Sequence, residues 1–307
     1  FGKMYGRTLL TVFVIIAAAL GALIVGISVY VFSYAHEELD LDLHNLKLNY
    51  TSFIYTTDSK GKVKQSQALF SGDNNRVWVD FENIPKTMKD AMEDKRFYDH
   101  KGVDWTRTLG AVTALSSSGG SYGGSTITQQ LIKNLTGDND VSINRKVKEI
   151  FRAQNLEKKY TKDEILEAYL NVVDFGAGTK GVQAAAKLYF NKNIEDCDVA
   201  ECAAIAGITQ NPYAYNPLTF PESNKERQQT VIQAMYDQEK ITEDEYNQAM
   251  EKSENMKFYG KISGQNYGEQ KVFNWYTEAL ITDVMADLQE LYGISEEEAS
   301  NMLYNGG

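Results

Sequence analysis

The chain has 307 residues, enough for one large domain or two modest ones with a sizeable buried core. Its formal net charge at pH 7 is −11, and this acidity argues against nucleic acid as a partner. Two cysteines, Cys197 and Cys202, are too few for a disulfide framework and do not have zinc-site spacing, so we predict small buried apolar residues. Four prolines and abundant Ala, Leu, Glu and Lys favour a mainly helical fold.

An uncharged apolar stretch at residues 8–35 stands near the start of the chain. It is long enough to cross a hydrocarbon core of about 30 Å, so we predict a transmembrane helix. A cleaved signal peptide is the alternative, but the apolar run is too long and no convincing cleavage site precedes Glu37. Lys3 and Arg7 come before the stretch and acidic residues follow it. The positive-inside rule therefore predicts a single-pass protein with a cytoplasmic N-terminus.

The segment after this helix is rich in β-forming residues. Tyr50–Thr56 and Val77–Phe81 predict strands, with turn residues at Asp58–Gly61. A helix is then expected from Pro85, because proline at the first helical position loses no hydrogen bond. This helix would end near Glu93.

Apolar periodicity and capping boxes predict helices through most of the remaining chain. Five helices are expected at Trp105–Leu115, Ser142–Lys158, Val182–Phe190, Val199–Ile208 and Val272–Tyr292. Three more are expected to begin at capping residues, after Thr161 with Glu164, after Thr242 with Glu245, and from Ser295.

A charged cluster at Glu93–Gly102 places adjacent carboxylates beside cations and aromatic side chains. Such surroundings suit a general acid or base, but a solvated, charge-paired helix end would have the same composition. Residues 93–160 contain eleven Lys and Arg against eight Asp and Glu, in an otherwise acidic chain. This basic island suggests an anionic ligand, although surface salt bridges could give the same count.

A second glutamate, Glu149, falls on the predicted helix Ser142–Lys158. Val147, Ile150 and Phe151 predict the buried face of this helix. Arg145, Glu149 and Arg152 share another face, and their spacing by itself favours an exposed ladder of salt bridges.

Glu93 and Glu149 nevertheless form a pair of carboxylates on separate helices, each beside arginine and lysine. Displacement at an anomeric carbon uses such a pair. The surplus of cations suits a pyrophosphate leaving group, because cations offset negative charge that grows in the transition state. Together with the membrane helix, this indicates a sugar donor carried on a lipid pyrophosphate.

Four segments have the order and spacing of a known set of motifs. They are Glu93–Gly102, Gly124–Gln130, Arg145–Glu149 and Lys162–Asn171. This set resembles the signature motifs of glycosyltransferase family 51, the peptidoglycan glycosyltransferase domain of class A penicillin-binding proteins. Gly181–Phe190 looks like the fifth motif, and the resemblance covers roughly Ile84–Met250.

The resemblance implies a lysozyme-like α-helical fold and inverting transfer from a lipid pyrophosphate donor to the 4-hydroxyl of an acceptor, which polymerises lipid II. It makes Glu93 the base that activates the acceptor and places Glu149 at the donor. It also implies three sets of supporting residues. Asp94 and Arg96 would support the first carboxylate, and Lys133, Arg145 and Lys146 would hold phosphates. The residues that would line the cleft by hydrogen bonding are Ser125, Gln129 and Gln130.

No cofactor is required by the sequence, and no metal-ligand cluster is evident in it. The resemblance allows a divalent cation, Mg²⁺ or Mn²⁺, at the pyrophosphate. It implies lipid II, the growing glycan strand and membrane lipid as partners, leaves room for partners in a cell-wall synthesis complex, and places the protein at a bacterial cell membrane with its catalytic domain outside. We interpret His100, which matches the first motif, as structural.

The predicted domains are a cytoplasmic tail at 1–7, a transmembrane helix at 8–35, a membrane-proximal neck at 36–83, the glycosyltransferase domain at 84–252 and a linker at 253–307. Ser295–Gly307 resembles the linker that leads into the transpeptidase domain of bifunctional members, so we expect this chain to be truncated before that domain. Two alternatives stay open: a lysozyme-like muramidase or lytic transglycosylase, and a non-catalytic scaffold of wall assembly. The basic island and the membrane helix favour synthesis.

Overall fold

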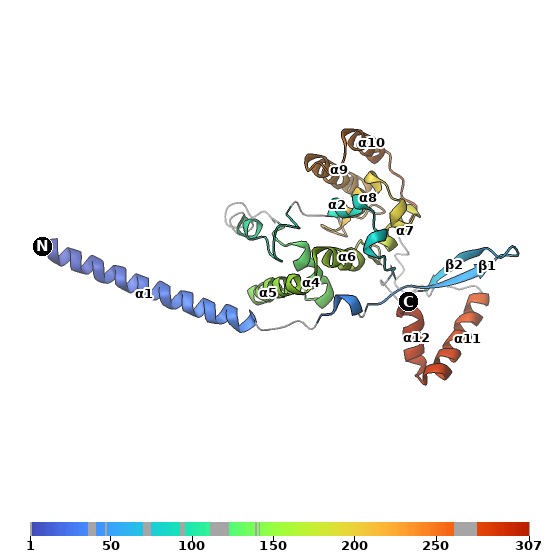
Figure 1. The fold of residues 1–307 in the computed structure, drawn as a ribbon, viewed down its shortest axis with the longest axis horizontal. Coiled ribbons are helices and arrows are strands. Elements are labelled where there is room, and N and C mark those ends of the chain that lie inside the picture. Colours follow the sequence, from blue (N-terminus) through green and yellow to red (C-terminus); the bar gives the residue numbers. More distant parts are fainter. Residues whose placement is uncertain are drawn as a thin grey trace. The chain divides into compact units, whose positions relative to one another are not determined.

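The structure is a computed structural model that describes residues 2–35, 41–46, 48–69, 75–92, 96–110, 123–138, 140, 142–260 and 275–306. Helices dominate these residues, which confirms the mainly helical fold class (Figure 1). The described α-helices are α1 Gly2–Ala35, α2 Lys86–Met92, α4 Ile127–Thr136, α5 Ile143–Lys159, α6 Lys162–Val172, α7 Val182–Phe190, α8 Val199–Ile208, α9 Pro221–Asp237, α10 Glu243–Glu254, α11 Trp275–Tyr292 and α12 Glu296–Asn305. Residues 105–110 are also helical, and the rest of the helix predicted at Trp105–Leu115 lies outside the described residues. The described strands are β1 Ser52–Thr57, β2 Val63–Leu69, β3 Asn75–Arg76 and β4 Thr179–Lys180.

The chain divides into two compact units. The first unit joins Phe1–Leu41 to His100–Tyr160, and the second joins Asp42–Asp99 to Thr161–Gly307. Each unit is therefore built from segments that are far apart in the sequence. The domain boundaries expected from the sequence stay a prediction.

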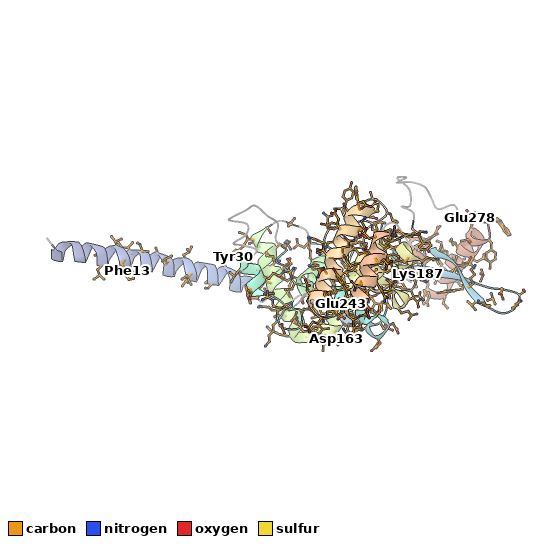
Figure 2. All side chains as sticks on the ribbon, turned by 90° about the horizontal axis from the view of Figure 1, so that it is seen from above. Phe13, Tyr30, Asp163, Lys187, Glu243 and Glu278 are labelled. Atoms are coloured by element: carbon orange, nitrogen blue, oxygen red, sulfur yellow. The ribbon has the colours of Figure 1, made fainter. Side chains whose placement is uncertain are left out.

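Helix α1 belongs to the first unit and agrees with the predicted transmembrane helix. Its segment Leu10–Tyr30 is long and apolar enough to cross a membrane. Apolar side chains project outward along this segment, and Phe13 is 69% exposed (Figure 2). An apolar surface of this length is suited to lipid, and its orientation stays a prediction.

Helices α4 and α5 pack side by side in the first unit (Figure 1). Leu131 of α4 and Ala153 of α5 are fully buried. The buried residues of α5 are Glu149, Ala153 and Leu156, so the predicted buried face of Val147, Ile150 and Phe151 is wrong. The buried face can include the charged Glu149 because Arg145 and Lys146 form ion pairs with its carboxylate.

Helix α8 forms the centre of the second unit and packs against α2, α9 and α10 (Figure 1). Its bounds are those predicted, and its alanines let the neighbouring helices approach closely. Cys202 on this helix is fully buried and Cys197 just before it is 6% exposed, both with free thiols, as predicted. Burial raises the pKa of the Cys197 thiol to about 12, which makes it a poor nucleophile.

The neck contains an antiparallel hairpin in which Ser52 of β1 pairs with Leu69 of β2. The turn at Asp58 forms as predicted, and its carboxylate accepts hydrogen bonds from the backbone N–H groups of Lys60 and Lys62. The second predicted strand, Val77–Phe81, is wrong. Residues 77–80 belong to no strand, and the short strand β3 just before them pairs in parallel with β4.

The backbone of Val79 is held by a side chain instead of a strand. The amide of Asn171, fully buried on α6, accepts from Val79 N at 2.8 Å and donates to Val79 O at 2.9 Å. The same amide donates to Glu167 O at 2.9 Å. A side-chain amide thus supplies the two hydrogen bonds that a neighbouring strand would have made.

Asn171→Ala is expected to destabilise the fold by about 2 kcal/mol, because the Val79 N–H and C=O lose their partners in a part-buried setting. The measurement is the thermal unfolding midpoint of the detergent-solubilised chain. Asn247→Ala, at an exposed position of α10, is the control and should leave the midpoint nearly unchanged. Equal midpoints for the two variants would contradict the assigned role of Asn171.

The C-terminal helices also connect to the neck. Ser295 and Glu298 form the predicted capping box of α12. At the other end of α12, Tyr50 N donates to Asn305 O at 2.8 Å. This hydrogen bond connects the neck to the end of α12, a contact that the local sequence pattern does not predict.

Candidate active site

The structure describes most of the predicted site residues, but Glu93 and Asp94 lie outside the described part of the chain. Arg96 belongs to the second unit, where it is half-buried in the turn at residues 96–99. The remaining predicted residues all belong to the first unit: Ser125, Gln129, Gln130, Lys133, Arg145, Lys146 and Glu149.

Glu149 is the centre of this group. It is only 5% exposed, and its two carboxylate oxygens form ion pairs with Arg145 Nη1 and Lys146 Nζ, both on the preceding turn of α5. The exposed ladder expected from spacing alone is therefore wrong, because this face packs toward α4. The two cations stabilise the ionised carboxylate, which would otherwise be costly to bury.

Lys146 also ties α5 to the second motif. Its Nζ donates to Ser125 Oγ at 2.8 Å, so one ammonium group joins a carboxylate and a hydroxyl from separate segments. The start of α5 is fixed by Ser142, whose side chain accepts from Arg145 N at 3.2 Å. Residues Ser125, Arg145, Lys146 and Glu149 are thus brought together in one charged cluster, which we call the Glu149 cluster.

Gln129 and Gln130 have different surroundings from each other. Gln129 is 1% exposed, and its side-chain oxygen accepts from Thr126 N at 2.9 Å in the capping box of α4. Its Nε2 atom is buried with no hydrogen-bond partner among the described residues. Gln130 is half-buried at the next position. Their roles toward a substrate stay predictions.

A shallow pocket opens beside the Glu149 cluster, with a volume of about 10 Å³, roughly room for one water molecule. An anionic group would therefore lie on this surface, not inside it. Three cations and two carboxylates line it, so the local charge is positive. The lining residues are Ile132, Lys133, Thr136, Asp138, Arg145, Glu149 and Arg152. Guanidinium and ammonium groups at this density suit phosphate oxygens.

His100 lies in a buried polar group that the sequence did not reveal. Its Nδ1 is 3.6 Å from Glu157 Oε1, and both side chains are 6% exposed. The same carboxylate oxygen accepts from Thr128 Oγ1 at 2.6 Å. This arrangement links the first motif to α4 and α5. Glu157 falls two turns beyond Glu149, but only the packing of α4 shows what it contacts.

Gly102 fixes the end of the first motif against α5. It has a φ of +84°, and a Cβ at this position would lie 2.6 Å from Ala153 O. Its carbonyl oxygen accepts from Thr126 Oγ1 at 2.7 Å. The backbone of the first motif therefore touches both the second motif and the helix that carries Glu149.

Gly102→Ala is expected to lower the stability of the first unit by about 2–4 kcal/mol, since overpacking against backbone adds to the strain of a positive φ. Gly137→Ala is the matched control, because Gly137 has a φ of +64° with nothing within 4 Å of its Cβ position. Thermal unfolding of the two variants separates the clash from the backbone strain. A loss for Gly102→Ala no larger than for Gly137→Ala would contradict the close packing.

Comparisons with known proteins identify relatives over most of the chain. The family model described as "Transglycosylase" matches residues 62–236. Penicillin-binding protein 1A of Clostridium perfringens (strain 13 / Type A) is 36% identical over 310 residues, covering 94% of this chain and 44% of that protein. Penicillin-binding protein 1F of Bacillus subtilis (strain 168) is 40% identical over 228 residues, covering 73% of this chain and 30% of that protein.

Among solved structures, the crystal structure of penicillin-binding protein 1A from Haemophilus influenzae matches with a TM-score of 0.41 and 19% identity, over 84% of this chain and 26% of that one. The chain spans less than half the length of the curated relatives named above.

Proposed function

Because this chain belongs to the transglycosylase family, we propose that it is a peptidoglycan glycosyltransferase that polymerises lipid II into glycan strands. The observation that carries the proposal is the buried Glu149 held by Arg145 and Lys146 next to a positively charged surface. A lipid pyrophosphate leaving group needs such cations, since negative charge develops on its oxygens as the glycosidic bond breaks. The apolar helix α1 also supports the proposal, because a membrane-anchored enzyme would meet its lipid-linked substrate in the membrane.

The proposed reaction is a single displacement with inversion at the donor's anomeric carbon. The 4-hydroxyl oxygen of the acceptor bonds to that carbon, the bond from the carbon to the pyrophosphate oxygen breaks, and Glu93 takes the hydroxyl proton. Asp94 and Arg96 would support Glu93. On the donor side, Lys133, Arg145 and Lys146 would contact the phosphates.

Glu149 would act at the donor by holding Arg145 and Lys146 in position and by stabilising the electron-poor sugar ring. The ion pairs on α5 support the first part of this role, since both cations are bound to its carboxylate. Ser125 would hold the Lys146 ammonium from the second motif, and Gln129 and Gln130 would complete the hydrogen bonding around the substrate.

A divalent cation, Mg²⁺ or Mn²⁺, is part of the proposal only as a counter-ion of the pyrophosphate. Within the described residues, no group of three or more His, Cys, Asp and Glu side chains could hold a metal ion. Glu149 is already paired with two cations, so it is a poor metal ligand here. The residues that the structure describes do not fit a resident metal, and no step of the reaction is assigned to one.

In the cell, the proposed site faces the outer side of a bacterial membrane, with the N-terminus in the cytoplasm. Lys3 and Arg7 before the apolar segment support this orientation. The proposed partners are lipid II, the growing glycan strand, membrane lipid and other proteins of a wall-synthesis complex.

The test is incubation of the purified chain, in detergent or nanodiscs, with labelled lipid II. Growth of glycan chains on a gel supports the polymerase. A second incubation with pre-formed labelled peptidoglycan tests the muramidase or lytic transglycosylase alternative, which predicts release of fragments. A protein inactive in both assays would point to the scaffold.

A further inference from the structure

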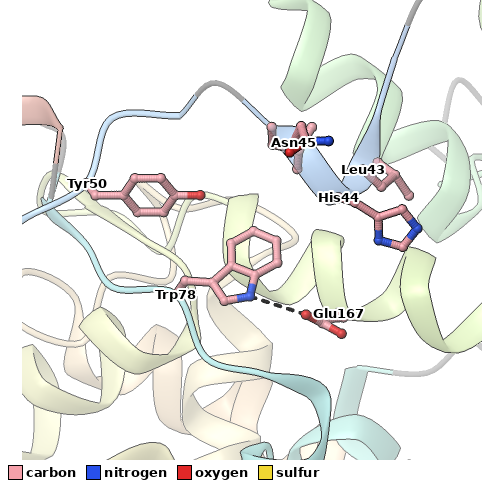
Figure 3. Close-up of a pocket in the computed structure, with 7 residues that line it drawn as sticks. Leu43, His44, Asn45, Tyr50, Trp78 and Glu167 are labelled. Atoms are coloured by element: carbon pink, nitrogen blue, oxygen red, sulfur yellow. Dashed lines mark hydrogen bonds between the residues drawn. The ribbon is translucent and has the colours of Figure 1, made fainter.

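A second, larger pocket lies in the second unit and has no part in the proposed reaction. Its volume is about 460 Å³. Figure 3 shows the rings of Tyr50 and Trp78 and the carboxylate of Glu167 around it, with His44 and Asn45 on its other side. None of these residues is among the predicted site residues, although Glu167 falls in the fourth motif.

The walls of this pocket are held in place by hydrogen bonds. Trp78 Nε1 donates to Glu167 Oε1 at 3.2 Å, which sets the indole edge against the carboxylate (Figure 3). Asn171 holds the backbone of both wall segments. Its amide forms hydrogen bonds with the N–H and C=O groups of Val79, next to Trp78, and with the carbonyl oxygen of Glu167. The aromatic and acidic groups are therefore preorganised for a ligand.

The charge around the pocket favours a cation. Burial raises the pKa of the Glu167 carboxyl, the hydrogen bond from Trp78 opposes this rise, and the nearby carboxylates Asp80 and Glu82 add to it. A positive ligand would offset this concentration of negative charge, whereas an anion would increase it.

Two basic side chains near this pocket, among the residues that the structure describes, have partners of their own. His44 Nε2 lies 3.3 Å from Glu164, an acidic residue one turn before Glu167 on α6. Arg76, whose charge acts on Tyr50, is 5% exposed and donates to Asn49 O at 3.1 Å. Neither interaction neutralises Glu167.

We propose that this pocket binds a basic side chain, lysine or arginine, of a partner polypeptide. Aromatic faces attract ammonium and guanidinium groups, and a carboxylate beside them adds a charge-assisted hydrogen bond. Trp78 and Tyr50 supply the aromatic surfaces, and Glu167 supplies the charge. The proposal concerns a site separate from the Glu149 cluster and does not depend on the proposed glycosyltransferase activity.

The test uses the full chain in nanodiscs, labelled with ¹⁵N at tryptophan. The sequence contains three tryptophans, and a Trp78→Phe variant identifies the indole N–H signal of Trp78. The probes are Nα-acetyl-lysine methylamide and Nα-acetyl-arginine methylamide, with Nα-acetyl-norleucine methylamide as the uncharged control. We expect a saturable shift of the Trp78 signal with at least one basic probe and none with norleucine.

Glu167→Gln should weaken binding of the basic probe about 10-fold, since it removes a charge in contact with the cation while keeping the side-chain volume. Tyr50→Leu, which removes one aromatic face, should weaken it about 3-fold. Glu278→Gln, at an exposed position of α11, is the matched control for loss of one negative charge and should bind as the unmodified chain does. A circular dichroism spectrum and a thermal unfolding midpoint equal to those of the unmodified chain show that each variant is folded.

The proposal is overturned if the norleucine probe shifts the Trp78 signal as the basic probes do. Equal affinity of Glu167→Gln and Glu278→Gln would overturn it as well. So would a shift that rises linearly with probe concentration without saturating.

Discussion

Glu93→Gln is expected to lower the rate of lipid II polymerisation by about 10³-fold, the usual contribution of a positioned general base. Glutamine keeps the size of the side chain but cannot take the proton of the acceptor hydroxyl. Because the proposed donor site uses Lys133, Arg145 and Lys146 and not Glu93, the KM for lipid II should change much less than kcat. The measurement is the initial rate of glycan formation from labelled lipid II at several substrate concentrations.

The matched control is Glu251→Gln, an exposed glutamate on α10, which should polymerise lipid II at the unmodified rate. Circular dichroism of both variants should be the same. If Glu93→Gln kept full activity, the assignment of the acceptor base would be wrong, and the family membership of the chain would still stand.

Glu149→Gln is expected to reduce kcat by about 10²-fold, because it removes the charge that pairs with Arg145 and Lys146, the two cations that we propose contact the donor phosphates. Arg145 and Lys146 are 20% and 33% exposed, so without the carboxylate they would turn toward solvent and away from the donor. Glu149→Asp, which keeps the charge on a shorter side chain, should recover part of the rate. Single-turnover kinetics with lipid II, in which the chemical step is observed directly, is the measurement.

A double variant separates positioning from a purely structural role. If Glu149 acts through Arg145, the losses from Glu149→Gln and Arg145→Met should be far from additive when combined. Additive losses would mean that the two residues act independently. Normal rate and normal donor affinity in Glu149→Gln would remove Glu149 from the mechanism altogether.

Much of the helical fold could be predicted because its signals are local. A capping box joins residues three positions apart, so Thr161 with Glu164 and Thr242 with Glu245 marked the starts of α6 and α10 correctly. The apolar runs of α1 and α8 were equally clear. The motifs that placed the chain in its family are short contiguous segments, which a sequence displays in full.

Residues with no local signal were predicted less well. Strand β2 was missed because its sequence, Val-Lys-Gln-Ser-Gln-Ala-Leu, has few β-branched or aromatic residues, and pairing with β1 defines it. The strand expected at Val77–Phe81 fails for the opposite reason. Its composition favours a strand, but the partner of Val79 is the side chain of Asn171, 92 residues away.

The sequence by itself determined the membrane-spanning candidate, most helices, the family and the chemical character of the site residues, since each depends on neighbouring residues along the chain. Only the tertiary structure decided that Glu149 is buried, because burial depends on the packing of α4 against α5 and on the two cations that make it tolerable. The pocket of Trp78 and Glu167 likewise exists only in the fold. Its walls meet across 89 positions of sequence, a distance over which no local pattern specifies a contact.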